Sequence, residues 1–173
     1  MRYRLLTIEQ ILTILAGTPP RIAGLTAGLS AAQLHTAPNP GAWSANDNLA
    51  HIRSCNVVWG SRMLTIITQD RPTFKGINPR SWIKKTDYLE QEFQPALLAF
   101  TTERAELLAV LEALPPEGWS CTGTLIDMVG KRLEQTVLGY ADAMARHERS
   151  HAKQIERIVN MMRRQLRDPL KSR

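Results

Sequence analysis

Two histidines four residues apart, His147 and His151, lie within an apolar stripe near the end of the chain. The other members of the stripe follow at intervals of three and four and are Val137, Tyr140, Met144, Ile155, Ile158 and Met162. Side chains at i and i+4 lie on one face of a helix with Cβ atoms about 6 Å apart, so their imidazoles can converge on one ion. The spacing therefore predicts a metal-binding pair on the buried face of the last helix.

A third histidine, His51, lies in an earlier segment with a helical pattern. Ser44 with Asp47 three positions later is a capping pattern, which places His51 about two turns into that helix. The remaining histidine, His35, lies in a loop-like stretch. Three neutral imidazoles suit zinc, nickel, copper or iron and leave a further coordination position open. Taken singly, each histidine is explained as a core or boundary residue, but together they predict a three-histidine metal site inside a helical bundle.

The last pair also overlaps a protease motif. Residues 147–151 read His-Glu-Arg-Ser-His and match the HExxH motif of zinc metalloproteases, in which the glutamate is the general base. The metzincin continuation would require glycine and histidine where this chain has Gln154 and Arg157. We therefore do not expect a peptidase. Glu148 is interpreted either as a group that orients an imidazole or as a solvated neighbour.

Three further residues are candidates for the surroundings of the site. Cys55 follows His51 by one turn and is a candidate metal ligand, redox group or wall residue of the same cavity. The more common role for a free cysteine is that of a small buried hydrophobic residue. Trp43 precedes the helix cap, where a staple residue packs, and is assigned a structural role. Arg104 lies in an apolar stripe, so its head either reaches a buried partner or, as we favour, snorkels to solvent.

Four long helices are expected to position these residues. Capping patterns and apolar spacings indicate helices that begin at Thr7, Ser44 and Asp87, and a fourth that runs from about Leu133 to Arg164. Pro19 predicts a kink or restart in the first helix and Pro95 a kink in the third. The segment from Arg71 to Lys85 is either an ordered loop that roofs a pocket or a plain connector. Residues 115–130 are expected to form a loop with a short extended piece.

Composition limits the class of protein. The 173 residues suit a single domain, 1–173, and the 43% hydrophobic and 6% aromatic content with sparse glycine and proline favours an all-α protein. Two cysteines without a CxxC pair are typical of a reducing, cytoplasmic environment. No segment approaches the ~18 uninterrupted apolar residues that a membrane span requires, so no membrane partner is expected.

The net charge of +6 raises the question of nucleic acid. The basic residues gather at the end of the last helix and its tail, at Arg157, Arg163, Arg164, Arg167, Lys171 and Arg173. Positive charge there complements the helix dipole, and no nucleic-acid motif accompanies it. We interpret this cluster as a solvated helix end and do not expect a nucleic-acid partner.

Several short motifs together resemble the DinB-like superfamily, also called YfiT-like and distinct from the translesion polymerase that shares the DinB name. They are Thr18-Pro19, Gly28-Leu29-Ser30, Pro40-Gly41-Ala42-Trp43-Ser44, Leu49-Ala50-His51-Ile52 and His147-Glu148-x-x-His151-x-x-Gln154-Ile155. The resemblance runs over essentially the whole chain, and the motifs occur in the family's order.

The resemblance implies an up-down-down-up four-helix bundle with a divalent metal, commonly nickel or zinc, held by His51, His147 and His151. Dimers are frequent in the family, so a homodimer is expected. Characterised members include S-transferases that use bacillithiol or mycothiol and a mycothiol-dependent maleylpyruvate isomerase. We therefore expect a small-molecule enzyme in which the metal deprotonates a low-molecular-weight thiol that attacks an electrophile. The alternatives are a metal-dependent hydrolase and a non-catalytic dimeric helical binding module.

Overall fold

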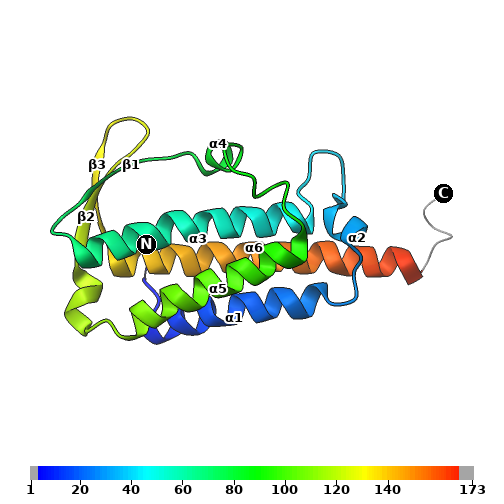
Figure 1. The fold of residues 1–173 in the computed structure, drawn as a ribbon, viewed down its shortest axis with the longest axis horizontal. Helices are drawn as coiled ribbons and strands as arrows, with labels where there is room; N and C mark the ends of the chain where they lie inside the picture. The colour runs from blue at the N-terminus through cyan, green and yellow to red at the C-terminus, as the bar shows by residue number, and fades with distance from the viewer. Residues whose placement is uncertain (1–3, 168–173) are drawn as a thin grey trace.

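Four long helices form the body of the protein, in a computed structural model that describes residues 4–167 (Figure 1). They are α1 (Ile8–Thr26), α3 (Ala45–Thr68), α5 (Phe93–Glu112) and α6 (Val137–Arg167). Short helical pieces join them: α2 (Ala31–His35), α4 (Pro79–Ile83) and the 3-10 turn η1 (Pro116–Ser120). Lys171 and Arg173 of the basic tail lie outside the described residues. Within the described range, no helix has the length and apolar character needed to cross a membrane.

The helices run up, down, down and up, as expected. α1 and α6 point in one direction, and α3 and α5 in the other (Figure 1). The backbone N–H of Leu6 donates to Asp142 near the start of α6, and Arg163 near the end of α6 donates to the carbonyl of Leu25. These bonds join the start of α1 to the start of α6 and the end of α1 to the end of α6, so the two helices are parallel neighbours.

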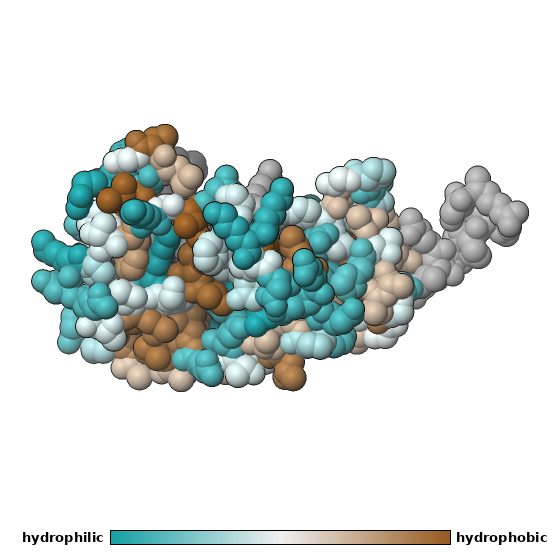
Figure 2. All heavy atoms as spheres, turned by 45° about the horizontal axis from the view of Figure 1, so that its top comes forward, coloured by the Kyte–Doolittle hydropathy of each residue, from teal (hydrophilic) through white to brown (hydrophobic). Residues whose placement is uncertain are grey.

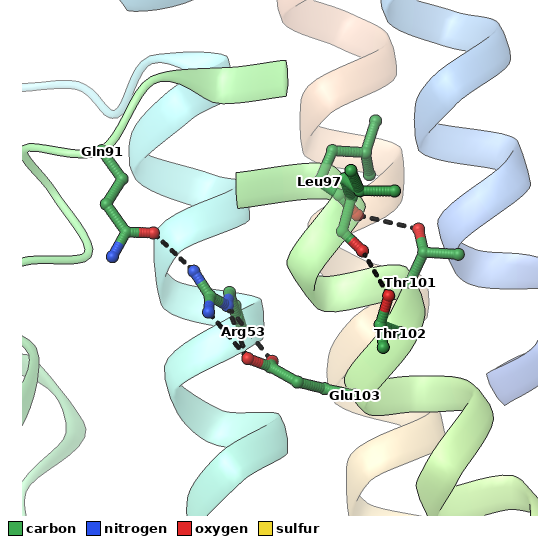
Figure 3. Close-up of polar contacts among 7 residues, drawn as sticks. Arg53, Gln91, Leu97, Thr101, Thr102 and Glu103 are labelled. Atoms are coloured by element: carbon green, nitrogen blue, oxygen red, sulfur yellow. Dashed lines mark hydrogen bonds and ion pairs between the residues drawn. The ribbon is translucent and has the colours of Figure 1, made fainter. Parts of the chain in front are cut away.

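α3 and α5 are likewise held together in parallel by polar contacts (Figure 3). Arg53 of α3 donates to both carboxylate oxygens of Glu103 on α5 and to the side-chain oxygen of Gln91, just before α5. Because consecutive long helices run the same way, residues 69–92 must return along the length of the bundle. This return segment contains α4 and the strand β1 (Thr73–Lys75).

A small sheet lies at one end of the bundle, and of its three strands only one was anticipated, as the short extended piece expected within residues 115–130. β1 pairs in parallel with β2 (Thr122–Ile126), which pairs antiparallel with β3 (Arg132–Thr136). The predicted helix start at Leu133 is therefore wrong, since α6 begins at Val137. The physical reasons are the β2–β3 turn, closed at Gly130 with φ +85°, and the Thr136 hydroxyl, which caps α6 by accepting from the N–H of Gly139. Hydrophobic side chains are exposed at the hairpin tip (Figure 2).

The structure revises both predictions that were made for prolines. α1 continues unbroken through Pro19, so the helix does not restart there. Pro95 is the third residue of α5, where a missing N–H removes no intrahelical bond, so the reason for expecting a kink disappears. The start predicted at Asp87 is also wrong, because α5 begins at Phe93.

The interior consists of two apolar clusters with a polar layer between them. The cluster near the sheet includes Ile11, Leu15, Met63, Leu107, Leu111, Val137 and Met144. The other includes Ile22, Leu49, Ile52, Phe93, Phe100, Ile155 and Val159. Along every long helix, the residues between the two clusters include a buried polar side chain: Thr18, Asn56, Arg104 and Glu148. The histidines lie at this level of the bundle.

Candidate metal centre

The structure brings the three predicted histidines together. His51 on α3 and His147 on α6 place their Nε2 atoms 2.9 Å apart. One ring nitrogen of each of the three, His151 included, lies within 4.8 Å of the others. His35 is not part of the group, and its Nε2 lies 3.7 Å from a carboxylate oxygen of Glu92. The i, i+4 spacing thus does put both imidazoles of α6 on the face that meets α3.

Asn48 orients one of the imidazoles. Its Oδ1 lies 2.9 Å from Nδ1 of His151, and its own Nδ2–H donates to the carbonyl of Ser44 at 2.8 Å. An amide oxygen only accepts, so Nδ1 of His151 carries the proton and Nε2 keeps its lone pair for a ligand. Metal-ligating histidines are commonly fixed in this way. Asn48 is fully buried and lies one turn before His51, and sequence reasoning missed it.

Electrostatics favour the neutral form of the two imidazoles on α6. Burial, followed by the proximity of His151 and His51, lowers the pKa of His147 to about 3. Burial also lowers the pKa of His151, against a hydrogen bond to Gln154 that raises it. At neutral pH the imidazoles of His147 and His151 are therefore in the form that binds metal ions.

The donor set fits a divalent ion such as zinc or nickel. Three imidazoles from two helices converge, and one of them is held in a fixed tautomer, as is common at metal sites. A pocket of about 890 Å³ adjoins two of them, His51 and His151, and would give a small molecule access to the group. It is lined by Gly41, Ala42, Trp43, His51, Ile77, Asn78, Pro79, Met128, His151 and Gln154. The return segment thus contributes to the lining of the pocket and is more than a plain connector.

Two tryptophans pack against the rings of the three histidines. Trp43 stacks on His151 with ring centroids 5.8 Å apart and lies 5.0 Å from the ring of His51. Trp59 meets the ring of His147 edge-on at 5.1 Å. A purely structural role for Trp43 is therefore wrong, since it lines the pocket and contacts two of the histidines.

Of the three roles considered for Cys55, which were ligand, redox group and wall residue, the structure supports that of a wall residue. Its Sγ lies 3.8 Å from Nε2 of His51, and the residue is buried. Burial, with a smaller contribution from the carboxylate of Glu148, raises the pKa of the thiol to about 12. Without a metal ion the thiol therefore stays protonated at neutral pH and is a poor nucleophile.

Glu148 faces the core. Its two oxygens accept from Nη1 and Nη2 of Arg104, and both side chains are almost fully buried. Arg104 also donates twice to Asn56 Oδ1 and once to the carbonyl of Leu15, which is free because Pro19 has no N–H. All five guanidinium N–H donors are used. The prediction that the Arg104 side chain snorkels to solvent is therefore wrong, and so is the interpretation of Glu148 as a solvated neighbour. Because both oxygens of Glu148 are bound to Arg104, this carboxylate is not available as a general base.

The depressed pKa of His147 predicts a pH-dependent stability for the metal-free protein. The unfolded chain binds a proton near pH 6.5 and the folded chain only near pH 3, so stability falls as pH decreases through this window. The stability advantage of the wild type over a His147→Gln variant should shrink below pH 6.5, by at most about 1.4 kcal/mol per pH unit. Urea unfolding of both EDTA-treated proteins at pH 7 and pH 5 measures this. Parallel pH profiles would contradict it.

Comparison with known proteins gives one family and one fold. A family model for the DinB superfamily matches residues 14–155. No curated protein matches the chain. A solved structure described as "YfiT from Bacillus subtilis is a probable metal-dependent hydrolase with an unusual four-helix bundle topology" is similar with a TM-score of 0.79. It is 14% identical, and the match covers 94% of this chain and 93% of that one, so it establishes the shared fold.

Proposed function

The chain belongs to the DinB superfamily, and on this premise we propose that it is a divalent-metal-dependent enzyme that transfers a low-molecular-weight thiol to an electrophile. His51, His147 and His151 hold the metal ion. The observation that carries the proposal is the convergence of these three imidazoles, two of which, His51 and His151, line a pocket of about 890 Å³.

The residues around the ion have separate tasks. A bound divalent ion supplies the Lewis acidity that converts a thiol into a thiolate at neutral pH. Asn48 holds His151 in the tautomer that presents Nε2, while Trp43 stacks on the ring of His151 and Trp59 meets the ring of His147 edge-on. Gln154 lines the pocket and offers amide hydrogen bonds to the electrophile.

Thiol transfer is preferred over hydrolysis because of what the pocket lacks. Hydrolysis at an HExxH site uses the glutamate to take a proton from water. Here Glu148 is bound to Arg104, and the lining of the pocket, within the described residues, contains no carboxylate. A thiol at a metal ion is deprotonated outright and needs no such base.

Metal-dependent hydrolysis is the second candidate. Its support is the structural likeness to YfiT, which is described as a probable metal-dependent hydrolase. The same three histidines would serve both reactions, and the two candidates differ in whether turnover requires a thiol.

The test is a thiol-dependence screen on protein purified without a His tag. Electrophilic acceptors are offered to zinc- or nickel-loaded protein with and without bacillithiol, mycothiol or glutathione. We expect turnover that needs both thiol and metal, stops with EDTA and returns with added metal. A His35→Ala variant, which changes the histidine outside the group, should retain it. Cleavage of esters or amides without any thiol would contradict thiol transfer and favour hydrolysis.

A further inference from the structure

Arg62 on α3 is a buried cation without an acidic partner. It is 9% exposed, and within residues 4–167 it forms no ion pair. Three arginines of α3, α5 and α6, by contrast, are each matched by a carboxylate: Arg53 by Glu103, Arg104 by Glu148 and Arg146 by Asp142. Buried charges in proteins are normally paired or bind a ligand. The exception at Arg62 therefore needs an explanation.

The contacts of Arg62 hold it in place and leave its charge uncompensated. Its Nη2–H donates to the carbonyl of Lys75 on β1 at 2.8 Å. The guanidinium carbon lies 5.7 Å from the ring centre of Phe74 and 5.9 Å from that of Tyr140. A carbonyl and two aromatic faces stabilise a cation, but they supply no negative charge. The planar guanidinium is thus fixed and ready for an anion.

Arg62 lines a small cavity that begins at the wall of the metal centre. The cavity has a volume of about 40 Å³ and is lined by Ser54, Cys55, Val58, Trp59, Arg62, Ile77, Pro79 and Trp82. It shares Ile77 and Pro79 with the large pocket. Cys55 and Trp59, which contact the histidines, form its near wall. The space suits a small planar group such as a carboxylate, since one water needs about 10–15 Å³.

We propose that Arg62 binds a carboxylate of the small molecule whose reacting atom lies at the three histidines. This inference rests on the proposed function and specifies its substrate class. Tyr140, beside the guanidinium, precedes His147 by seven residues on α6, and at a rise of 1.5 Å per residue the two lie ~10 Å apart along the helix axis. The substrate therefore carries its carboxylate at the far end of a chain of that length from its reacting atom.

The test compares two thiols that differ only at the far end, 6-mercaptohexanoate and 6-mercaptohexanol. Their binding to zinc-loaded protein is measured by calorimetry. The wild type should bind the acid about tenfold or more tightly than the alcohol, because the carboxylate gains charge-assisted hydrogen bonds. Arg62→Met should bring the ratio close to one with unchanged zinc content, and Arg62→Lys should keep part of it. Arg53→Met removes the same charge elsewhere on α3 and should preserve the ratio.

Two results would overturn the role of Arg62: no acid preference in the wild type, or an Arg62→Met variant that loses affinity for acid and alcohol equally with a lowered Tm. The second result would make the residue structural. Failure of the proposed function is recognised separately, by titrating metal-free protein with hexanoate and hexanol and following tryptophan fluorescence. If the wild type binds no zinc but binds hexanoate, and Arg62→Met abolishes that binding, the carboxylate site is still supported. If the wild type does not bind hexanoate, the carboxylate site is refuted.

Discussion

Replacing His147 with alanine is expected to abolish stoichiometric metal binding and all turnover. The imidazole is one of three converging donors, and its Nε2 lies 2.9 Å from that of His51. Loss of a residue that merely orients a ligand costs roughly 10–100-fold in metal affinity, so loss of a ligand itself should exceed about 100-fold. Elemental analysis of untagged protein and competition with a chelator measure the two quantities.

The matched control is His35→Ala, which removes a histidine that lies outside the group and should leave one ion per chain. Circular dichroism of the His147→Ala protein checks that the helices persist, since the buried pair of Arg104 and Glu148 is untouched. Substoichiometric zinc and nickel in the wild type, unchanged in the variant, would end the metal hypothesis and with it the proposed enzyme.

The sequence was sufficient for the part of the site that lies on one helix. His147 and His151 follow from helical spacing alone, because residues at i and i+4 share a face in any α-helix. His51 required the fold, since only the packing of α3 against α6 brings it to the pair. The resemblance to a family with this bundle provided that step, and the geometry agrees with it.

The residues around the histidines were predicted less well, for two physical reasons. Asn48 and Trp43 act through the direction of their side chains, and a sequence pattern does not specify rotamers or which neighbour they reach. Arg104 and Glu148 lie 44 residues apart on different helices, so nothing local indicates that they meet. One signal was present: Pro19 leaves a helix carbonyl without its usual donor, and a buried arginine can supply that donor.

The small sheet shows the same limit. The β2–β3 hairpin depends on pairing with β1, which comes from the return segment some fifty residues earlier. Its own signals are weak, because β3 carries charged and polar residues such as Arg132 and Glu134 and runs directly into α6. Tertiary pairing therefore decided the structure of residues 132–136, where the apolar spacing of the following helix had suggested more helix.

Breaking the buried ion pair should have the largest effect on stability. An Arg104→Met substitution leaves the Glu148 carboxylate uncompensated in the polar layer between the two apolar clusters. Removing one partner of a buried pair costs about 3–5 kcal/mol of unfolding free energy. Here it also deprives Asn56 and the carbonyl of Leu15 of their donors. Urea unfolding of the metal-free variant should show a midpoint shift of this size with an unchanged m-value.

The double variant Arg104→Met with Glu148→Leu distinguishes the cost of an unpaired charge from the value of the pair. Because replacing a buried pair by apolar side chains is often close to neutral, the double variant should recover most of the loss suffered by Arg104→Met alone. It should also still bind metal, since neither residue faces the ion. If Glu148 were instead the proton acceptor of an HExxH enzyme, the double variant would fold and bind metal yet lose turnover with every substrate. Retained thiol-dependent turnover in a folded double variant is the outcome that the core-facing position of Glu148 requires.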